Sequence, residues 1–266
     1  PLMHLSNLTE DDVFSGERSA QVLFDPVKQA TLTAQVFSTM ERKGYRGLDV
    51  DFENLPAEQR LPYAQFLTAL RKRLAPMGYP LMAAVAPKVS DDQPGQLYEG
   101  HGYPELGKAV DYLLLMTYEW GYAAGPPMAV APLPQVRQVL DYAVTAVPRE
   151  KILLGIPNYG YNWPISFEQG VTRAQSLSNQ EAVALAIEHG AEIQYDEEAQ
   201  SPWFRYTDQS GQQREVWFED ARSLLAKLDL ITEYQLRGCG FWNLMRPWPQ
   251  GWATLNGRFH VEDSTW

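Results

Sequence analysis

The sequence predicts an α/β fold built on a parallel sheet. Apolar runs of strand length recur along its 266 residues, and helix-like patterns fill the stretches between them. Near-continuous apolar strands are typical of a parallel sheet that helices cover on both faces. The alternation of strand and helix favours right-handed crossovers between parallel neighbours. The length also suits one large domain, since an eight-stranded α/β barrel needs about 250 residues.

Six strands are predicted from these apolar runs, whereas a closed barrel needs eight. Two alternatives therefore remain open: the fold is an open sheet, or the first two strand-helix units lie outside this chain. The six predicted strands cover residues 1–7, 47–53, 80–88, 111–120, 151–161 and 238–245.

The segments between these strands carry helix start and stop signals. Asp25 and Pro26 fit an N-cap followed by proline at the first helical position, and Gly44 fits a C-terminal stop. The apolar stripe predicted for this helix consists of Val27, Ala30, Ala34, Phe37 and Met40. The next helix, over 61–78, has a stripe of Tyr63, Phe66, Leu67, Leu70 and Leu74. Further helices are predicted after Pro134 and over 221–230.

The strand-helix rhythm breaks after the strand at 151–161. Residues 178–190 read as a capped helix that ends at Gly190. Residues 191–218 read as short antiparallel strands that turn at 208–211. We therefore predict a small α+β insertion over residues 162–217.

The charge balance limits the possible partners. Lys and Arg number 22 against 33 Asp and Glu, a formal net charge of −11, which disfavours nucleic acid. The one cysteine, Cys239, excludes an intrachain disulfide, and no histidine or cysteine cluster has metal-ligand spacing. We expect no membrane partner, because no apolar stretch approaches the roughly 18 to 20 residues of a membrane span. No signal peptide is visible, and composition does not identify a compartment.

Three carboxylates alternate along the strand at 47–53. Since successive strand residues face opposite sides, Asp49, Asp51 and Glu53 share one face of this strand. Crowding them makes full ionisation costly, so we expect at least one raised pKa and a shared proton. A carboxylic acid that stays protonated near neutral pH can protonate a poor leaving group. Two alternatives are carboxylates paired with buried cations or solvated at an edge, and a divalent metal site.

The segment GLDVDFE resembles the D-G-x-D-x-D-x-E signature of family 18 glycoside hydrolases, the chitinase superfamily, with Arg46 in place of the first acid. LLLMTYEW (113–120) resembles the sixth-strand motif of that family, and GFWNL (240–244) resembles its eighth-strand motif. Together with residues 156–163 and 193–223, the pattern is most similar to the branch of bacterial spore cortex-lytic and cell-wall N-acetylglucosaminidases. The resemblance runs from about residue 2 to residue 260.

This resemblance implies a (β/α)₈ TIM barrel over residues 1–266, with its first two strand-helix units missing from the chain and the 162–217 insertion after strand seven. It also implies retaining catalysis in which the 2-acetamido oxygen of the substrate is the nucleophile, an exception to the usual two-carboxylate scheme. By position, Glu53 is the general acid and base. Asp51 holds the acetamide, Asp49 shares a proton with Asp51, and Tyr118 contacts the acetamide oxygen.

The same resemblance implies the substrate-binding residues. Trp242 is expected to form an apolar platform under the sugar, with Met116 beneath the ring. Glu119 stands where chitinases usually have Asp and is expected to contact a sugar hydroxyl. Asn158, Tyr159 and Trp120 are further candidates. His4 and His101 show no partner pattern, so solvated or core histidines are expected.

We therefore expect an O-glycosyl hydrolase that cleaves β-1,4 bonds after N-acetylglucosamine in peptidoglycan, with spore cortex as one candidate source and spore germination as the context. The alternatives are a chitinase acting on chitin oligomers and a non-catalytic carbohydrate-binding relative. No cofactor or metal is expected, the partner is a glycan, and a monomer is expected. By resemblance alone, the location is extracellular, in the cell wall or spore coat.

Overall fold

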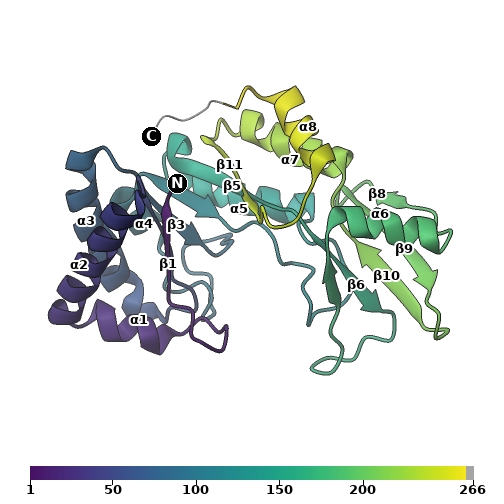
Figure 1. The fold of residues 1–266 in the computed structure, drawn as a ribbon, viewed down its shortest axis with the longest axis horizontal. Helices are drawn as coiled ribbons and strands as arrows, with labels where there is room; N and C mark the ends of the chain where they lie inside the picture. Colours follow the sequence, from purple (N-terminus) through teal and green to yellow (C-terminus); the bar gives the residue numbers. More distant parts are fainter. Residues whose placement is uncertain (262–266) are drawn as a thin grey trace.

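Two sheets organise the protein (Figure 1). The computed structural model describes residues 1–261. One sheet has six strands in the order β1-β2-β3-β4-β5-β11, and the other has five in the order β7-β6-β10-β9-β8. Among the described residues, no helix combines the length and the apolar character needed to cross a membrane.

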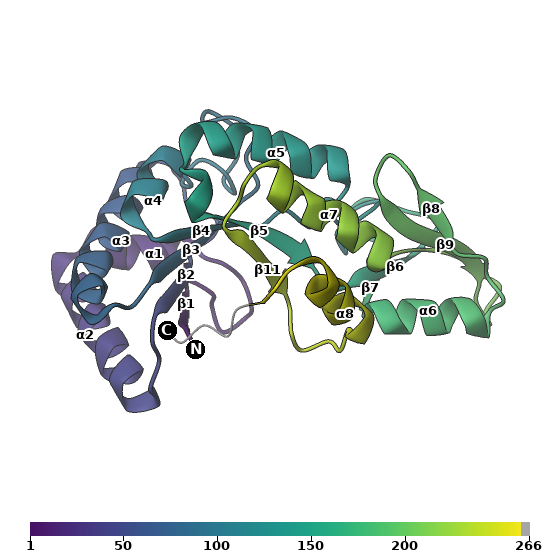
Figure 2. The same cartoon turned by 90° about the horizontal axis from the view of Figure 1, so that it is seen from above.

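The six-stranded sheet is parallel throughout. Its strands follow one another along an arc in Figure 2, with β1 and β11 at the two edges. The α/β class and the six predicted strands are thus confirmed. The strands are β1 (Met3–Ser6), β2 (Leu48–Asp51), β3 (Leu81–Val85), β4 (Tyr112–Leu115), β5 (Ile152–Pro157) and β11 (Gly238–Trp242).

Helices lie along the outer side of this arc (Figure 2). They are α1 (Gly16–Leu23), α2 (Pro26–Lys43), α3 (Arg60–Leu74), α4 (Tyr103–Ala109), α5 (Leu133–Ala146), α7 (Ala221–Glu233) and α8 (Pro249–Arg258). Three short 3₁₀ turns connect elements: η1 (Ala57–Gln59), η2 (Ala75–Met77) and η3 (Arg149–Lys151).

The signals at the ends of α2 are confirmed, but its predicted stripe is partly wrong. Asp25 caps the first turn through its side chain, and Gly44 ends the helix with a φ of 72°, a conformation that glycine adopts without strain. Val27 is exposed, and the buried positions of α2 are Val36 and Met40. Ala30 and Ala34 are also exposed, whereas Leu32 and Phe37 pack partly buried against the core. The core-facing side of the helix is therefore rotated from the predicted stripe. All five predicted residues of the α3 stripe are buried.

The run at 151–161, predicted as one strand, is divided between the two sheets. β5 ends at Pro157, and β6 begins at Gly160 and pairs with β10 and β7 in the second sheet. Local sequence does not show this change of partner, because both halves are apolar. The second sheet therefore begins two residues before the predicted boundary at 162.

The antiparallel sheet and one helix form a small α+β unit between β5 and α7. Ser178 and Glu181 form a capping box at the start of α6, and Gly211 provides the left-handed turn between β9 and β10. Its elements are β6 (Gly160–Pro164), β7 (Gln175–Leu177), α6 (Asn179–Glu188), β8 (Gln194–Asp196), β9 (Ser201–Thr207) and β10 (Gln213–Trp217). It has its own apolar cluster around Phe204, Val216 and Phe218.

A buried ion pair joins this unit to α7. Lys227 Nζ lies 2.8 Å from Glu219 Oε2, and the two side chains are only 1% and 0% exposed. The backbone N–H of Glu219 donates to Asn179 Oδ1 on α6. Glu219, two residues beyond the end of β10, is therefore held from both α6 and α7.

We expect Lys227→Met to lower the free energy of unfolding by about 3–5 kcal/mol, because it leaves the buried Glu219 without its cation. Chemical denaturation at neutral pH measures the change. Arg137→Ala is the matched control, since the Arg137–Glu233 pair lies at the surface and its loss should cost about 1 kcal/mol or less. Equal stability of the two variants would contradict the expected energetic role of the buried pair.

Candidate functional site

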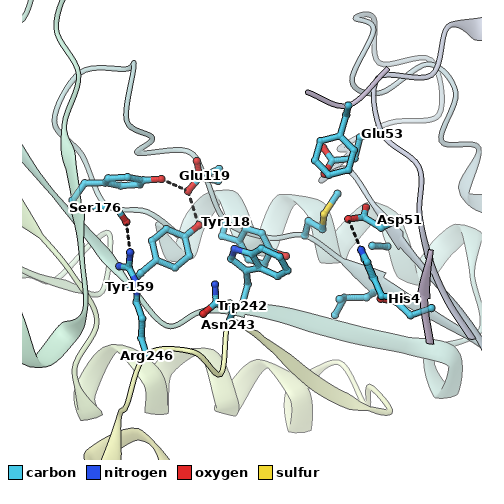
Figure 3. A pocket seen from close by; sticks show the side chains of 16 residues that line it. His4, Asp51, Glu53, Tyr118, Glu119, Tyr159, Ser176, Trp242, Asn243 and Arg246 are labelled. Carbon is cyan, nitrogen blue, oxygen red and sulfur yellow. Dashed lines mark hydrogen bonds and ion pairs between the residues drawn. The ribbon is translucent and has the colours of Figure 1, made fainter. Parts of the chain in front are cut away.

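A cavity of about 380 Å³ opens at the carboxyl ends of the parallel strands. Eight of the ten predicted site residues line it: Asp49, Asp51, Glu53, Met116, Tyr118, Glu119, Tyr159 and Trp242. They come from β2, β4, β5 and β11 or the residues that follow these strands. The carboxyl ends of parallel strands meet at one edge of a sheet, which is where α/β barrels place their active sites. In Figure 3 Glu53, Asp51 and His4 lie at one end of this cavity, and Glu119, Tyr159 and Arg246 lie at the other.

Alternation along β2 separates its acids from its apolar residues. Leu48, Val50 and Phe52 belong to the main core. Asp49 and Asp51 face the cavity, together with Glu53 two residues beyond the end of β2. The same period of two that buries the apolar set therefore collects the carboxylates on the cavity side.

Asn7 fixes the backbone at Glu53. The buried Asn7 side chain accepts from the Glu53 N–H at 2.9 Å and donates to the Glu53 carbonyl at 2.8 Å. The next residue, Asn54, has a φ of 55° and donates to the Phe14 carbonyl. Two side-chain amides thus hold the point where the chain leaves β2, so the direction of the Glu53 side chain is constrained.

Burial keeps two of the carboxyl groups protonated to unusually high pH. The pKa of Glu53 is raised to about 8, chiefly by desolvation and then by the charges of Asp51 and Glu119. Desolvation also raises the pKa of Asp51 to about 6, while a charge on His4 lowers it and Asp49 raises it. The expected rise is present, but burial contributes more than the crowding from which it was predicted. The Oδ1 atoms of Asp49 and Asp51 are buried without a hydrogen-bond partner among the described residues.

His4, expected to be a solvated or core histidine, is half-exposed and belongs to this carboxylate group. Its Nδ1 lies 2.8 Å from Asp49 Oδ2, and its Nε2 lies 4.0 Å from Asp51 Oδ2. The hydrogen bond to Asp49 raises the pKa of His4, and its partial burial opposes this rise. His101, in contrast, is a buried core residue between Ala86 N–H and the Phe52 carbonyl.

Glu119 lies beyond the end of β4 and is held by two tyrosines. Its φ is 68°, a left-handed conformation that is uncommon for a residue other than glycine and occurs at functional sites. The hydroxyl groups of Tyr159 and Tyr161 donate to Glu119 Oε1 at 2.5 and 2.9 Å. Burial raises the pKa of Glu119, and these two hydrogen bonds partly offset the rise. Both tyrosines come from the start of the second sheet, which therefore contributes directly to the cavity.

Trp242 presents a half-exposed ring, 52% accessible, between the two ends of the cavity (Figure 3). Its carbonyl accepts from the Asn158 N–H at 2.7 Å. The Asn158 side chain donates to the carbonyls of Asn243 and Arg246, each at 2.9 Å. Asn158 is itself fully buried. The structure thus places it behind the segment 242–246, where it positions the cavity wall, and not in the substrate contact predicted for it.

Trp120 does not line the main cavity. It borders a smaller hollow of about 170 Å³ together with Tyr98 and Leu97. This hollow shares Glu53, Tyr118 and Glu119 with the main cavity, so the two spaces meet at these side chains. The position of Trp120 still allows contact with a long ligand that extends past Glu53.

Sequence reasoning missed His4, Phe14, Ser176, Asn243 and Arg246, all of which line the cavity. For His4 a signal existed, because parallel pairing of the first two predicted strands in register places it beside Asp49. For Asn243 and Arg246 the signal was their position just after the last predicted strand. Ser176 and Phe14 come from segments that show no strand-end pattern.

The site has an acid that can donate a proton, a flat aromatic surface, and polar groups around both. Such a site suits a ligand that has polar groups and a ring with an apolar face. A carboxyl group with a pKa of about 8 carries a proton at neutral pH and can donate it. A broad exposed indole suits the C–H face of a pyranose. Tyr118, Glu119 and Tyr159 offer hydroxyl and carboxyl groups around the same space.

Comparison with protein families gives a match to glycosyl hydrolases family 18 over residues 14–246. The cortical fragment-lytic enzyme of Bacillus subtilis is 42% identical over 264 residues, which cover 99% of this chain and 61% of that protein. The chain spans about three fifths of the length of this relative and of its Bacillus anthracis counterpart.

Solved structures show the same similarity. The spore cortex-lytic enzyme SleL of Bacillus cereus superposes with a TM-score of 0.95 at 38% identity, covering 98% of this chain and 60% of that one. A chitinase from Chromobacterium violaceum superposes with a TM-score of 0.89 at 29% identity, covering 97% of this chain and 79% of the chitinase chain. The six-stranded sheet with its outer helices is thus shared with family 18 enzymes.

The raised pKa of Glu53 predicts a pH-dependent effect of Glu53→Gln on stability. Because the folded protein holds this proton up to about pH 8, the contribution is fully present below the ordinary carboxyl pKa and is lost as pH rises through about 8. The glutamine variant cannot lose that proton. Its melting temperature should therefore rise relative to wild type by a few degrees between pH 5 and pH 8.5.

Thermal unfolding of both proteins across that pH range measures this difference. Glu58→Gln is the control, because Glu58 is exposed in η1, close in sequence to Glu53. A difference between Glu53→Gln and wild type that stays constant with pH would contradict the raised pKa.

We expect Asn158→Ala to lower the free energy of unfolding by about 1–3 kcal/mol, because it removes the buried side-chain donor to the carbonyls of Asn243 and Arg246. Amide hydrogen exchange should also become faster in the segment 242–246. Asn256→Ala, at an exposed position of α8, is the control and should change stability by less than about 0.5 kcal/mol. Unchanged exchange in 242–246 would show that Asn158 does not hold this segment.

Proposed function

Since the chain belongs to family 18 of the glycosyl hydrolases, we propose that it hydrolyses the β-1,4 bond on the reducing side of N-acetylglucosamine in peptidoglycan. The observation that carries this proposal is Glu53, a buried and protonated acid that faces a cavity beside Asp51 and the exposed ring of Trp242. An acid with this pKa suits the protonation of a glycosidic oxygen near neutral pH.

In this proposal Glu53 donates its proton to the glycosidic oxygen as the bond from that oxygen to the anomeric carbon breaks. The carbonyl oxygen of the 2-acetamido group forms the new bond to the anomeric carbon, as in the substrate-assisted exceptions to two-carboxylate hydrolysis. The carboxylate of Glu53 then takes a proton from the water that attacks the anomeric carbon. Two inversions at that carbon leave its configuration unchanged.

Asp51 and Asp49 assist the acetamide group in this scheme. Asp51, deprotonated above its pKa of about 6, accepts from the acetamide N–H and stabilises the positive charge of the cyclic intermediate. Asp49 lies in the same cavity and is held by His4, so it can share a proton with Asp51. This division of roles uses all three acids of the β2 face.

The remaining cavity residues fit the sugar. Tyr118 contacts the acetamide oxygen, Trp242 stacks on the apolar face of the ring, and Met116 packs beneath it. Glu119 and Tyr159 bind sugar hydroxyls. Their mutual hydrogen bond keeps the two side chains close enough to contact the same sugar. Trp120 contacts a sugar that extends beyond Glu53 into the smaller hollow.

The relatives favour peptidoglycan over chitin as the substrate. The more similar proteins are named for lysis of spore cortex or its fragments, whereas the chitinase is 29% identical. We propose spore cortex during germination as the source of the glycan, and a location outside the cell in the cell wall or spore coat. We also propose that residues 1–266 act as one catalytic unit and a monomer; residues 262–266 lie outside the described part of the chain.

A non-catalytic carbohydrate-binding protein is the second candidate. It is favoured by one observation, the exposed indole of Trp242 in an aromatic-lined cavity, which suits binding with or without catalysis. The presence of Glu53 favours the enzyme, because a binding protein has no use for a protonated acid at that position.

We expect purified spore cortex to release products that end in reducing N-acetylglucosamine, with weaker release from chitin hexamer. Glu53→Gln should lower the rate by about 10²–10⁴-fold, the typical contribution of a general acid. Mass spectrometry of the products from both proteins measures this.

Glu58→Gln serves as the matched control and should retain wild-type activity. Binding of both glycans without release of product by wild type would favour the carbohydrate-binding alternative. Equal rates for wild type and Glu53→Gln would remove Glu53 from its proposed role.

A further inference from the structure

Of the described residues that line the main cavity, Arg246 is the one Lys or Arg. It follows β11 by four residues and lies at the end of the cavity opposite Asp51 and His4 (Figure 3). Four acidic residues line the same space. The proposed roles for cleavage of the glycosidic bond do not use this cation.

The arginine is held in place by neutral groups. Its Nη2 donates to Ser176 Oγ at 2.9 Å, and its guanidinium lies 6.0 Å from the centre of the Tyr159 ring. Its backbone carbonyl accepts from the buried Asn158. The position is therefore fixed from β7 and from the loop between β5 and β6, and no described carboxylate makes a hydrogen bond or ion pair with the guanidinium.

No carboxylate within residues 1–261 lies within ion-pair distance, 4.0 Å, of the Arg246 guanidinium. The charge of Arg246 lowers the pKa of Glu181, but the carboxylate of Glu181 accepts hydrogen bonds from Ser178. Glu119, in the same cavity, accepts from two tyrosine hydroxyls. The Nη1 of Arg246 is buried and has no hydrogen-bond partner among the described residues. A buried donor left unpaired is costly, so an acceptor that reaches this guanidinium gains more than it would at an open surface.

We propose that Arg246 binds a carboxylate carried by a sugar next to the N-acetylglucosamine at the reaction centre. The planar guanidinium matches a carboxylate through two parallel hydrogen bonds, and such a group would supply the acceptor that Nη1 lacks. This inference rests on the proposed function and adds to it the substrate feature that separates peptidoglycan from chitin.

The chemistry of the glycan supports this assignment for either direction of binding. In peptidoglycan N-acetylglucosamine alternates with a sugar that bears a lactyl ether, so both neighbours of an N-acetylglucosamine carry this arm. When the arm is unsubstituted it ends in a carboxylate. Chitin is neutral throughout and offers Arg246 only hydroxyl and amide groups.

The test compares two forms of one substrate. Peptide-free peptidoglycan strands with free lactyl carboxylates are assayed beside the same strands after conversion of those carboxylates to methyl esters. For wild type, esterification should lower kcat/KM about tenfold or more, mainly through KM, as expected for loss of a charged hydrogen bond. The preference should weaken at high salt.

Arg246→Gln should bring the ratio of the two kcat/KM values close to one, and Arg246→Lys should keep part of the preference, because it keeps the charge but not the planar fork. Arg173→Gln is the matched control: it removes an exposed positive charge three residues before Ser176 and should leave the wild-type ratio. Thermal unfolding checks that each variant is folded.

A wild-type protein that cleaves both forms equally, or an Arg246→Gln variant that keeps the wild-type preference, would overturn the inference and leave the proposed hydrolysis intact. Cleavage of neither strand nor of chitin hexamer would overturn the proposed hydrolysis instead. In that case calorimetry measures the binding of the free-acid and methyl-ester strands to Glu53→Gln and to the double variant Glu53→Gln/Arg246→Gln. A preference for the free-acid strand that only the single variant shows would assign this role to Arg246 without turnover.

Discussion

Burial of carboxyl groups at the end of β2 is the constraint on which the site depends. Desolvation is the largest cause of the raised pKa of both Glu53 and Asp51. Such burial is unfavourable for any ionised acid, so the surrounding fold must hold these groups against their tendency to reach water. Asn7 does so through the backbone of Glu53, and the apolar face of β2 does so through the core. The protonated state of Glu53 is therefore a property of the whole sheet edge.

The second sheet is part of the same site and not an appendage to it. Its first strand supplies Tyr161 to Glu119, and Tyr159 just before that strand donates to the same carboxylate. Asn179 at the start of α6 contacts Asn158 and the backbone of Glu219. Asn158 in turn holds the carbonyls of the segment 242–246, and Glu219 pairs with Lys227. A continuous set of polar contacts thus runs from the core of α7 to the wall of the cavity. The Lys227–Glu219 pair and the contacts of Asn179 are buried, and the contacts that reach the cavity wall are partly buried. A loss at one point therefore leaves a polar group without its partner.

The elements with a strong local period could be predicted from the sequence, and those that depend on distant partners could not. The α3 stripe and the alternating acids of β2 follow from periods of 3.6 and two, which act within one segment. The division of residues 151–161 between β5 and β6 depends on which strand each half pairs with, and local pattern does not contain that choice. Asn158 was assigned to the right region but to the wrong side of the cavity wall, because only packing decides whether an amide faces a ligand or backbone carbonyls. Crowding of acids was visible in the sequence, whereas their burial was not.

The two tyrosine hydroxyls on Glu119 have a consequence for engineering by exchange of segments. Tyr159 lies between β5 and β6, and Tyr161 lies within β6, so both belong to the junction at which the second sheet begins. A chimera whose grafted segment lacked these two tyrosines would remove the donors on Glu119 while every residue of β2 and β4 stayed the same. The ionisation of the cavity would then change with the graft. Exchanging the β5–β6 junction therefore alters the ionisation of the cavity as well as its shape.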